Sequence, residues 1–341
     1  MEKECASQQS PTSTVVGIDE AGYGPLLGPL VVSAAVFDVP VAVLKELKDP
    51  AAGPDLWALL RASLTRKPAR RDARLAVADS KKLFKRSSGK SLALLERAAL
   101  TFVGQVGDSP RTLRDLLNRL CPGLPDAMQQ YPWYKDVDVD LPGHVSADDL
   151  ATQRNALKQD LATNGVRFRG IYTEILPAGH FNQRIEATKN KAVVLFGLTT
   201  RLMQRVADDV GTRPLRIWVD RQGGRTHYRR PLMTAFQEAE LDILEESPDR
   251  CGYRLTHPFA PWAVRFVKNG ETHHLPIALA SIISKYTREL LMGCFNRYWT
   301  RHVPGLKPTA GYYQDGKRFL ADIDGVVCRL GIDRATLIRS L

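Results

Sequence analysis

Acidic residues directly follow two apolar runs of the sequence, and this placement suits the binding of cations. Asp19 and Glu20 follow residues 15–18, and Asp220 follows residues 215–219. A charged side chain at the end of a buried strand is costly unless it is paired or bound to a cation. Since ligands of layered α/β sheets lie outside the carboxyl ends of the strands, we expect these acids to converge there. Taken singly, such acids also occur as turn residues or helix caps.

A helical face provides a second set of polar residues. Within residues 281–289, spacings of three and four place five polar side chains on one side of a helix. These are Ser281, Ser284, Lys285, Arg288 and Glu289. Upstream, residues 79–82 form a cationic turn that contains Ser80 and Lys81. By themselves, the two segments are also typical of a solvated helix face and of a capped helix start.

The chemistry that these acids can support is that of hard divalent cations. The five cysteines show no C-x-x-C spacing and the seven histidines show no ligand spacing, so a zinc site is not indicated. Carboxylate clusters without nitrogen or sulfur ligands suit Mg²⁺ or Mn²⁺. Two such ions about 4 Å apart activate a water and stabilise the leaving oxygen in phosphodiester cleavage. The residues therefore predict a metal-dependent nuclease or a phosphotransferase.

The overall charge favours a polyanionic partner. The 341 residues include 48 Lys and Arg against 37 Asp and Glu, which gives a formal net charge of +11. Nucleic acid is therefore the expected partner. A membrane is not expected, because the longest apolar run, residues 25–39, contains Gly, Pro, Ser and Asp and is shorter than the about 20 residues of a spanning helix. The polar start of the chain and the scattered cysteines predict a cytoplasmic protein.

The elements that must position these residues alternate along the chain. Apolar runs predict strands over 15–19, 30–37, 166–175, 215–220 and 253–268. Helical spacing occurs over 91–102, 181–210, 231–246, 277–299 and 316–341. This alternation predicts a mixed α/β domain, with a central sheet flanked by helices and a helical C-terminal part.

The domain organisation follows from changes in composition. We expect a disordered tail over 1–14 and one catalytic domain over 15–341. Residues 103–165 are rich in Pro, Gly and Asp without a sustained period, which predicts an insertion or subdomain. Between Asp126 and Asp160, seven acids stand against three bases, so we do not expect this insertion to belong to the basic surface.

Five blocks of the sequence carry a resemblance to a known family, and they occur in the family's order. They are Gly17-Ile18-Asp19-Glu20-Ala21-Gly22-Tyr23-Gly24-Pro25-Leu26-Leu27-Gly28-Pro29, Asp79-Ser80-Lys81-Lys82-Leu83, Asp220 at the end of its strand, Ala280-Ser281-Ile282-Ile283-Ser284-Lys285-Tyr286-Thr287-Arg288-Glu289 and Gly311-Tyr312. Together they resemble the type 2 ribonuclease H family, ribonuclease HII.

The resemblance implies an RNase H-like fold and an endonuclease that hydrolyses the RNA strand of RNA/DNA hybrids, or a ribonucleotide-containing duplex, as a monomer. It implies that two Mg²⁺ or Mn²⁺ ions are held by four acids, with Lys81 and Lys285 at phosphates and Tyr312 stacked against a sugar near the scissile bond. The four implied metal ligands are Asp19, Glu20, Asp220 and Glu289. The implied substrate-binding residues are Gly22, Tyr23, Gly24, Ser80, Lys81, Lys285 and Tyr312.

The sequence departs from the family pattern at three places. Glu289 replaces the family's usual Asp, and Tyr313-Gln314 replaces Gly-Thr. Tyr23 replaces the arginine of a Gly-Arg-Gly turn that helps to read the ribose 2′-hydroxyl, and a tyrosine hydroxyl cannot supply an arginine's fork of donors. Two alternatives stay open: a related RNase H-fold nuclease that acts on another nucleic-acid substrate, and a catalytically inactive nucleic-acid-binding homologue. The presence of all four acids speaks against the second.

Overall fold

The computed structural model describes residues 11–46, 52–69, 71–84, 91–135, 137–256 and 261–340. Of the tail expected over 1–14, residues 1–10 lie outside this description, whereas residues from Thr12 onward already belong to the first strand. Thr14 is buried there and its hydroxyl donates a hydrogen bond of 2.7 Å to Asp38. The strand therefore begins three residues earlier than its apolar run, because its first polar side chains are paired within the sheet.

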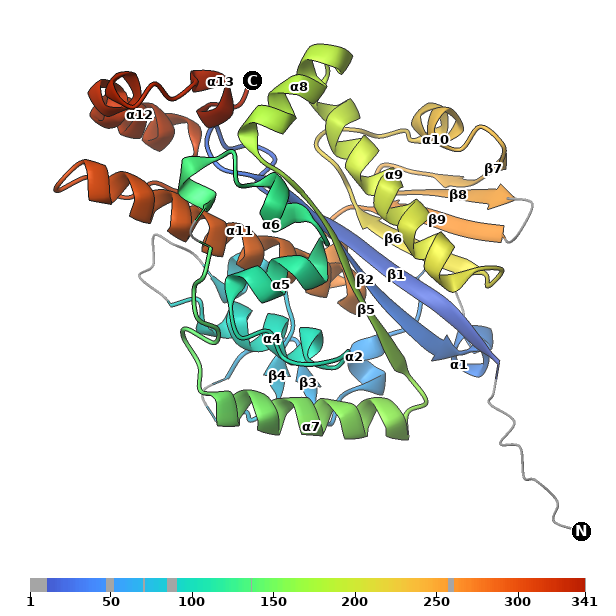
Figure 1. Ribbon diagram of the computed structural model, residues 1–341. Helices are drawn as coiled ribbons and strands as arrows, with labels where there is room; N and C mark the ends of the chain where they lie inside the picture. The colour runs from blue at the N-terminus through green and yellow to red at the C-terminus, as the bar shows by residue number, and fades with distance from the viewer. Residues whose placement is uncertain are drawn as a thin grey trace, which may run out of the picture.

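A seven-stranded mixed sheet forms the centre of the described structure (Figure 1). In spatial order the strands are β5 (Arg167–Leu176), β2 (Leu30–Pro40), β1 (Thr12–Ala21), β6 (Leu215–Asp220), β9 (Pro261–Val267), β8 (Arg250–Thr256) and β7 (Glu240–Glu246). β1 is antiparallel to β2 but parallel to β6, and β6 is parallel to β9. The carboxyl ends of β1, β6 and β9 therefore meet at one edge. The mixed α/β class predicted from the sequence is confirmed.

Two long helices cover the faces of this sheet (Figure 1). α9 (Lys191–Val210) packs on one face, where its apolar side chains share a core with Val16 and Ile18 of β1. α11 (Leu275–His302) packs on the other face, which includes Val15. Because successive residues of a strand point to opposite faces, β1 is buried on both sides, as an unbroken apolar run predicts.

The close packing of α11 on β1 depends on a glycine. A Cβ atom at Gly17 would lie 2.1 Å from the carbonyl carbon of Pro276, so no side chain fits there. α4 (Ala93–Val103) lies on the outer side of α11, and the buried Glu96 accepts a 2.8 Å hydrogen bond from the hydroxyl of Tyr286. These contacts fix α11 along β1, and α11 thereby reaches the edge where the acids lie.

Residues 103–165 fold into helices rather than into an irregular segment. They contain α5 (Leu113–Leu120), α6 (Leu124–Ala127), the 3₁₀ helix η2 (Pro132–Tyr134) and α7 (Ala147–Thr163). Their apolar side chains join the same core as α4 and α11; the ring centre of Trp133, for example, lies 5.5 Å from that of Phe295. Several of these helices are short, and a short amphipathic segment shows little periodicity.

The helix expected over 181–210 is two helices. α8 (Ala178–Thr188) ends at Lys189, which adopts a left-handed conformation with φ of 51°. Asn190 then caps α9, since its side chain accepts hydrogen bonds from the amides of Ala192 and Val193. The polar residues at this break are therefore a stop and a start signal inside a continuous helical pattern.

The helix expected over 231–246 is a short helix followed by a strand. α10 (Arg229–Ala235) ends before Phe236, and β7 follows at the edge of the sheet. Leu241 of β7 pairs with Leu255 of β8. Pairing with a neighbouring strand has overridden the helix propensity of the Glu and Leu residues in this segment.

Two further expectations are corrected in detail. The strand expected over 253–268 is two strands, β8 and β9, and residues 257–260 between them lie outside the described part of the chain. The helix expected over 316–341 is α12 (Tyr313–Arg329) followed by the short α13 (Arg334–Leu337). Among the helices of the described residues, none combines the length and the apolar character that crossing a membrane requires.

The remaining elements are short. They are α1 (Val41–Lys45), α2 (Leu56–Leu59), α3 (Ser80–Leu83), the 3₁₀ helix η3 (Gly270–Thr272) and a separate two-stranded sheet of β3 (Leu64–Thr65) and β4 (Leu75–Ala76).

Candidate active site

Asp19, Glu20 and Asp220 lie at the shared edge of β1 and β6. The parallel ladder between the two strands ends with Ile18 opposite Val219, so Asp19 and Asp220 are the next residues on each strand. The antiparallel ladder with β2 stays regular through Ala21. Asp19 is buried, whereas Glu20 and Asp220 are half-buried. The structure therefore brings these three acids together without a bulge in the strand.

A fourth acid, Glu271, belongs to the same group. It lies in η3, directly after β9, and the amide of Gly270 donates a hydrogen bond of 2.8 Å to Oδ1 of Asp220. The carboxyl group of Glu271 interacts with that of Asp220 and raises its pKa. Glu271 is not among the acids expected from the sequence. The signal was present, however, because an acid follows the apolar strand once β9 is taken to end at Val267.

Burial, together with repulsion between the negative charges, raises the pKa of Asp19, Glu20 and Asp220. Burial, followed by the charges of Glu20 and Asp220, raises the pKa of Asp19 well above its usual range. Burial and Asp220 raise the pKa of Glu20 to about 8, although Lys81 acts in the opposite direction. Burial and Glu271 raise the pKa of Asp220 to about 7. Such a group is stable only when protons or cations neutralise part of its charge.

The four carboxylates, which we call the acidic edge, fit divalent cations by their chemistry. Within the described ranges, no group of three or more His, Cys, Asp or Glu side chains is already arranged so that it could hold a metal ion. Oε2 of Glu271 is buried and has no hydrogen-bond partner among the described residues. A buried carboxylate oxygen without a hydrogen-bond partner, close to Asp220 and Glu20, suits Mg²⁺ or Mn²⁺, which take oxygen ligands and retain several waters.

Glu289 is not brought to the acidic edge. α11 passes this edge at Ser281, which hydrogen bonds to the carboxyl group of Asp19, and at Ser284, whose hydroxyl donates to the carbonyl of Asp19. Glu289 lies eight residues beyond Ser281, which is about 12 Å along a helix. It is buried, and its Oε1 lies 2.7 Å from Nζ of Lys285. The expectation for Glu289 is therefore corrected: it forms an ion pair within α11.

The two lysines with expected phosphate contacts differ in their surroundings. Lys81 is exposed in α3 and close enough to Glu20 to lower the pKa of that acid. Lys285 is paired with Glu289 instead. Ser80 is buried, and its hydroxyl lies 3.0 Å from that of Ser281, which ties α3 to α11. Of these residues, Lys81 is the one that can meet an anion beside the acidic edge.

The turn of residues 22–24, which we call the glycine turn, follows Glu20 directly. Gly22 has φ of 89°, a conformation that favours glycine. The ring of Tyr23 lies 5.0 Å from Nζ of Lys191. Burial and Glu20 raise the pKa of Tyr23, whereas Arg225 and Arg339 lower it. The tyrosine that replaces the family's arginine is thus surrounded by cationic side chains from three other parts of the chain.

Tyr312 lies beside the loop that continues from the glycine turn. The carbonyl of the preceding Gly311 accepts hydrogen bonds from the amides of Leu26 and Leu27, at 2.7 Å and 3.1 Å. The side chain of Tyr312 is exposed at the start of α12, so it is available to a ligand. At Gly24, a Cβ atom would meet no other atom within 4 Å, so this side of the turn is open.

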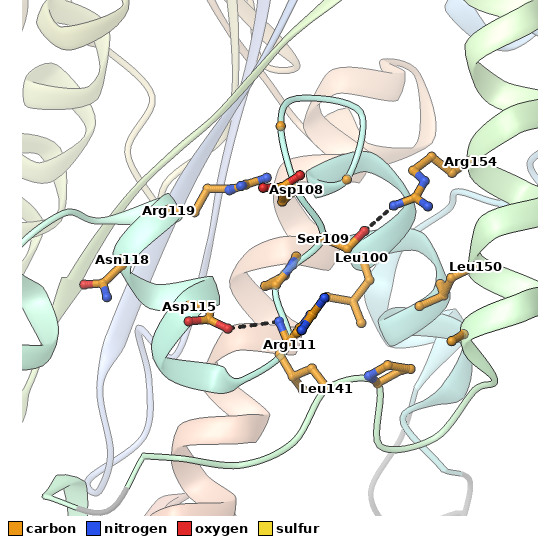
Figure 2. A pocket seen from close by; sticks show the side chains of 15 residues that line it. Leu100, Asp108, Ser109, Arg111, Asp115, Asn118, Arg119, Leu141, Leu150 and Arg154 are labelled. Carbon is orange, nitrogen blue, oxygen red and sulfur yellow. Dashed lines mark hydrogen bonds between the residues drawn. The ribbon is translucent and has the colours of Figure 1, made fainter.

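A cavity of about 1060 Å³ lies elsewhere, between α4, α5 and α7 (Figure 2). Arg111, Arg119 and Arg154 are among the residues that line it, and none of the acids described above does. Arg154 donates to the hydroxyl of Ser109, and Arg119 donates to the carbonyls of Val103 and Val106. The cavity is therefore separate from the acidic edge.

The structure is similar to solved structures of ribonucleases of the HII and HIII types. A structure of Bst-RNase HIII in complex with Mn²⁺ aligns with 98% of this chain and 68% of its own length, with 14% identity and a TM-score of 0.41. RNase HII from Archaeoglobus fulgidus, in complex with PCNA, covers 96% of this chain and 93% of its own, with 14% identity and a TM-score of 0.37. Ribonuclease H2 from Pyrococcus horikoshii covers 95% and 92%, with 14% identity and a TM-score of 0.38.

These neighbours are of the type that the sequence motifs resemble, and the likeness is one of fold. No protein-family model and no curated protein matches the sequence.

Proposed function

We propose that this protein is a metal-dependent endonuclease of the ribonuclease H type, which hydrolyses the RNA strand of RNA/DNA hybrids. The observation that carries the proposal is the acidic edge: four carboxylates lie at the ends of β1, β6 and β9, where burial and the repulsion between neighbouring acids raise the pKa of Asp19, Glu20 and Asp220. The sequence blocks around Asp19, Lys81 and Tyr312 resemble ribonuclease HII, and the net charge of +11 favours a nucleic-acid partner.

Four acids would bind the metal ions, and contacts from neighbouring elements hold two of these acids in place. Asp19, Glu20, Asp220 and Glu271 would hold two Mg²⁺ or Mn²⁺ ions. When bound, such ions activate a water molecule and stabilise the leaving oxygen of a phosphodiester. Gly270 keeps Asp220 oriented through its amide, and Ser281 and Ser284 keep Asp19 in place from α11. Asp19 and Asp220 are therefore each held by a neighbouring element, which limits how far these two acids must move to reach the reactive geometry.

Substrate contacts come from the rim of the acidic edge. Lys81 lies on the α3 side and would bind a phosphate of the cleaved strand. Tyr23 and Tyr312 lie on the side of the glycine turn, where a ring can stack against a sugar. A tyrosine at position 23 supplies one hydroxyl, so the recognition of a single 2′-hydroxyl is weaker than with an arginine fork. We therefore propose a preference for continuous hybrids, whose A-like minor groove offers several hydroxyls.

The experiment is a cleavage assay on a panel of substrates with Mg²⁺ or Mn²⁺. The panel contains an RNA/DNA hybrid, a DNA duplex with one ribonucleotide, double-stranded RNA and single-stranded forms. The proposal requires cleavage of the RNA strand of the hybrid, at a higher rate than of the single-ribonucleotide duplex. Cleavage of another member alone would support a related nuclease of different specificity, and binding without cleavage would support an inactive homologue.

A further inference from the structure

The C-terminal end of the chain lies against the loop that contains the glycine turn. Leu27 forms a β-bridge with Ile338, and the amide of Arg339 donates a hydrogen bond of 2.9 Å to the carbonyl of Leu26. Residues 334–340, which we call the C-terminal segment, also pack beside α8, and Figure 1 shows α13 next to the start of that helix. Segments from opposite ends of the sequence thus meet beside the candidate active site.

The side chain of Arg339 reaches further, to the glycine turn itself. Its Nη1 donates to the carbonyl of Gly22, and its Nη2 donates to the carbonyl of Tyr23 at 3.1 Å. The guanidinium lies 4.0 Å from the ring centre of Phe181 on α8 and is 2% exposed. One planar fork therefore binds two successive carbonyls of the turn while its face is held by an aromatic ring.

The C-terminal segment has anchors of its own, which do not involve Arg339. The side-chain amide of Asn182 donates to the carbonyls of Ala335 and Ile338, both at 2.7 Å. Its Oδ1 accepts from the amide of Ser340, also at 2.7 Å. Leu337, which belongs to the segment, is buried. The segment is thus docked on α8 by several bonds, and Arg339 extends from this docked segment to the turn.

Burying the charge of Arg339 in this contact costs free energy. The carbonyls of Gly22 and Tyr23 that accept hydrogen bonds from Arg339 are neutral, and its Nε is buried without a hydrogen-bond partner among the described residues. Burial and the nearby Arg288 lower the pKa of Arg339 to about 9. A charge buried against neutral acceptors destabilises the folded state. A role in shaping the glycine turn would offset this cost.

We propose that Arg339 is a positioning residue, which fixes the glycine turn through the carbonyls of Gly22 and Tyr23 and makes the C-terminal segment a part of the substrate-binding site. Arg288 holds the far end of the same loop, since it donates to the carbonyls of Leu27 and Pro29. Because Arg339 holds the start of this loop and Arg288 holds its end, Tyr23 stays in place near Glu20. This inference rests on the proposed function, and its first test does not depend on nuclease activity.

The first test measures hydrogen exchange in peptides that cover residues 20–28. In Arg339→Met the stem still packs on Phe181, but the two donors to the turn are lost. We expect exchange in these peptides to become about tenfold faster, while peptides of β6 keep the wild-type rate. Arg334→Met is the matched control, because Arg334 lies in the same segment, is exposed and pairs with Asp324 on α12. Unchanged exchange at residues 20–28 in folded Arg339→Met would overturn the proposal.

The second test measures hybrid cleavage. We expect the KM of Arg339→Met to rise about tenfold, with kcat within about threefold of wild type, because the turn binds substrate and the acids are untouched. Arg339→Lys, which keeps one donor, should recover part of this loss. A KM equal to that of Arg334→Met would contradict the proposal. If Arg339→Met does not fold, Asn182→Ala loosens the docked segment instead, and the same changes are expected at residues 20–28.

The outcomes of the two tests distinguish a failure of the proposed function from a failure of the role proposed for Arg339. If wild type cleaves no member of the substrate panel, the proposed function is wrong, yet exchange at residues 20–28 still decides whether Arg339 positions the turn. If wild type cleaves the hybrid and Arg339→Met neither loosens the turn nor raises KM, the proposed function stands and the role of Arg339 is wrong.

Discussion

At the scale of single residues, Glu271 and Glu289 show why an acid in a matching motif need not be a ligand. Glu271 follows β9 and Glu289 lies in α11. Glu271 interacts with Asp220 of the acidic edge, whereas Glu289 is paired with Lys285. Glu271→Gln removes a charge from the acidic edge, so we expect kcat on a hybrid to fall at least about 100-fold, with little loss of stability.

Glu289→Gln is the matched comparison, since it makes the same chemical change. We expect its kcat to stay within about threefold of wild type. Its free energy of unfolding should fall by about 1–3 kcal/mol, because Lys285 then loses its partner in a largely buried place. Steady-state kinetics and urea unfolding of both variants measure these effects. The assignment is wrong if Glu289→Gln loses turnover and Glu271→Gln does not.

Tyr23 shows that the surroundings of a residue cannot be predicted from its own motif. The sequence shows that an arginine of the related turn is missing, but not what stands around it. In the structure Lys191, Arg225 and Arg339 approach the tyrosine from three other segments. A further arginine at position 23 would meet repulsion from these cations. Their contacts join residues far apart in the sequence, so no local pattern could have indicated them.

At the scale of elements, the strands that carry the acids could be predicted well. β1 and β6 are short apolar runs that end in acids, and the burial of β1 on both faces follows directly from that pattern. The same rule would have found Glu271 if β8 and β9 had been separated. The apolar pattern over 253–268 predicts a single strand, and this pattern does not show that β9 ends at Val267.

Other elements could not be predicted from local pattern. β7 has residues that favour helices, and it is a strand because it pairs with β8 at the edge of the sheet. The helices of 103–165 are short, and much of their order comes from packing on α4 and α11. The position of Glu289 also depended on tertiary structure, because the path of α11 past the sheet edge decides which of its residues face Asp19.

The contact between β1 and α11 gives a prediction for these elements. Gly17→Ala places a Cβ atom against the backbone of Pro276, so α11 must move away from β1. We expect the free energy of unfolding to fall by at least about 2 kcal/mol, as in other overpacked cores. Gly197→Ala in α9 is the control, because a Cβ atom there meets nothing within 4 Å, and alanine should raise stability by about 1 kcal/mol.

Urea unfolding of both glycine variants measures this difference. The result would count against the packing described if Gly17→Ala were as stable as Gly197→Ala.

At the scale of the whole molecule, the acidic edge couples stability to pH and to metal ions. Unfolded Asp and Glu have pKa values near about 4, whereas the folded values rise to about 8 for Glu20 and about 7 for Asp220. Between these limits the folded state binds more protons than the unfolded state, so these groups make stability fall as pH rises. Bound cations favour the ionised carboxylates and oppose this loss.

We therefore expect the metal-free protein to lose thermal stability as pH rises from about 5.5 to about 8. Added Mg²⁺ or Mn²⁺ should raise Tm more at the higher pH. Asp220→Asn removes one of the titrating groups, so the pH dependence of its Tm should be shallower than that of wild type. Thermal unfolding by circular dichroism at both pH values, with chelator or with metal, measures each effect. An identical pH dependence in wild type and variant would show that Asp220 does not titrate as described.

The central claim is that the acidic edge cleaves nucleic acid by holding divalent cations, and Asp19→Asn tests it most directly. Asparagine has nearly the same shape but lacks the charge that holds a cation. Cleavage of an end-labelled RNA/DNA hybrid, measured together with hybrid binding in the presence of Mn²⁺, should show turnover below about one per cent of wild type with nearly unchanged binding. Turnover by Asp19→Asn comparable to that of wild type, or wild-type cleavage that persists after chelation of all divalent metal, would contradict the account.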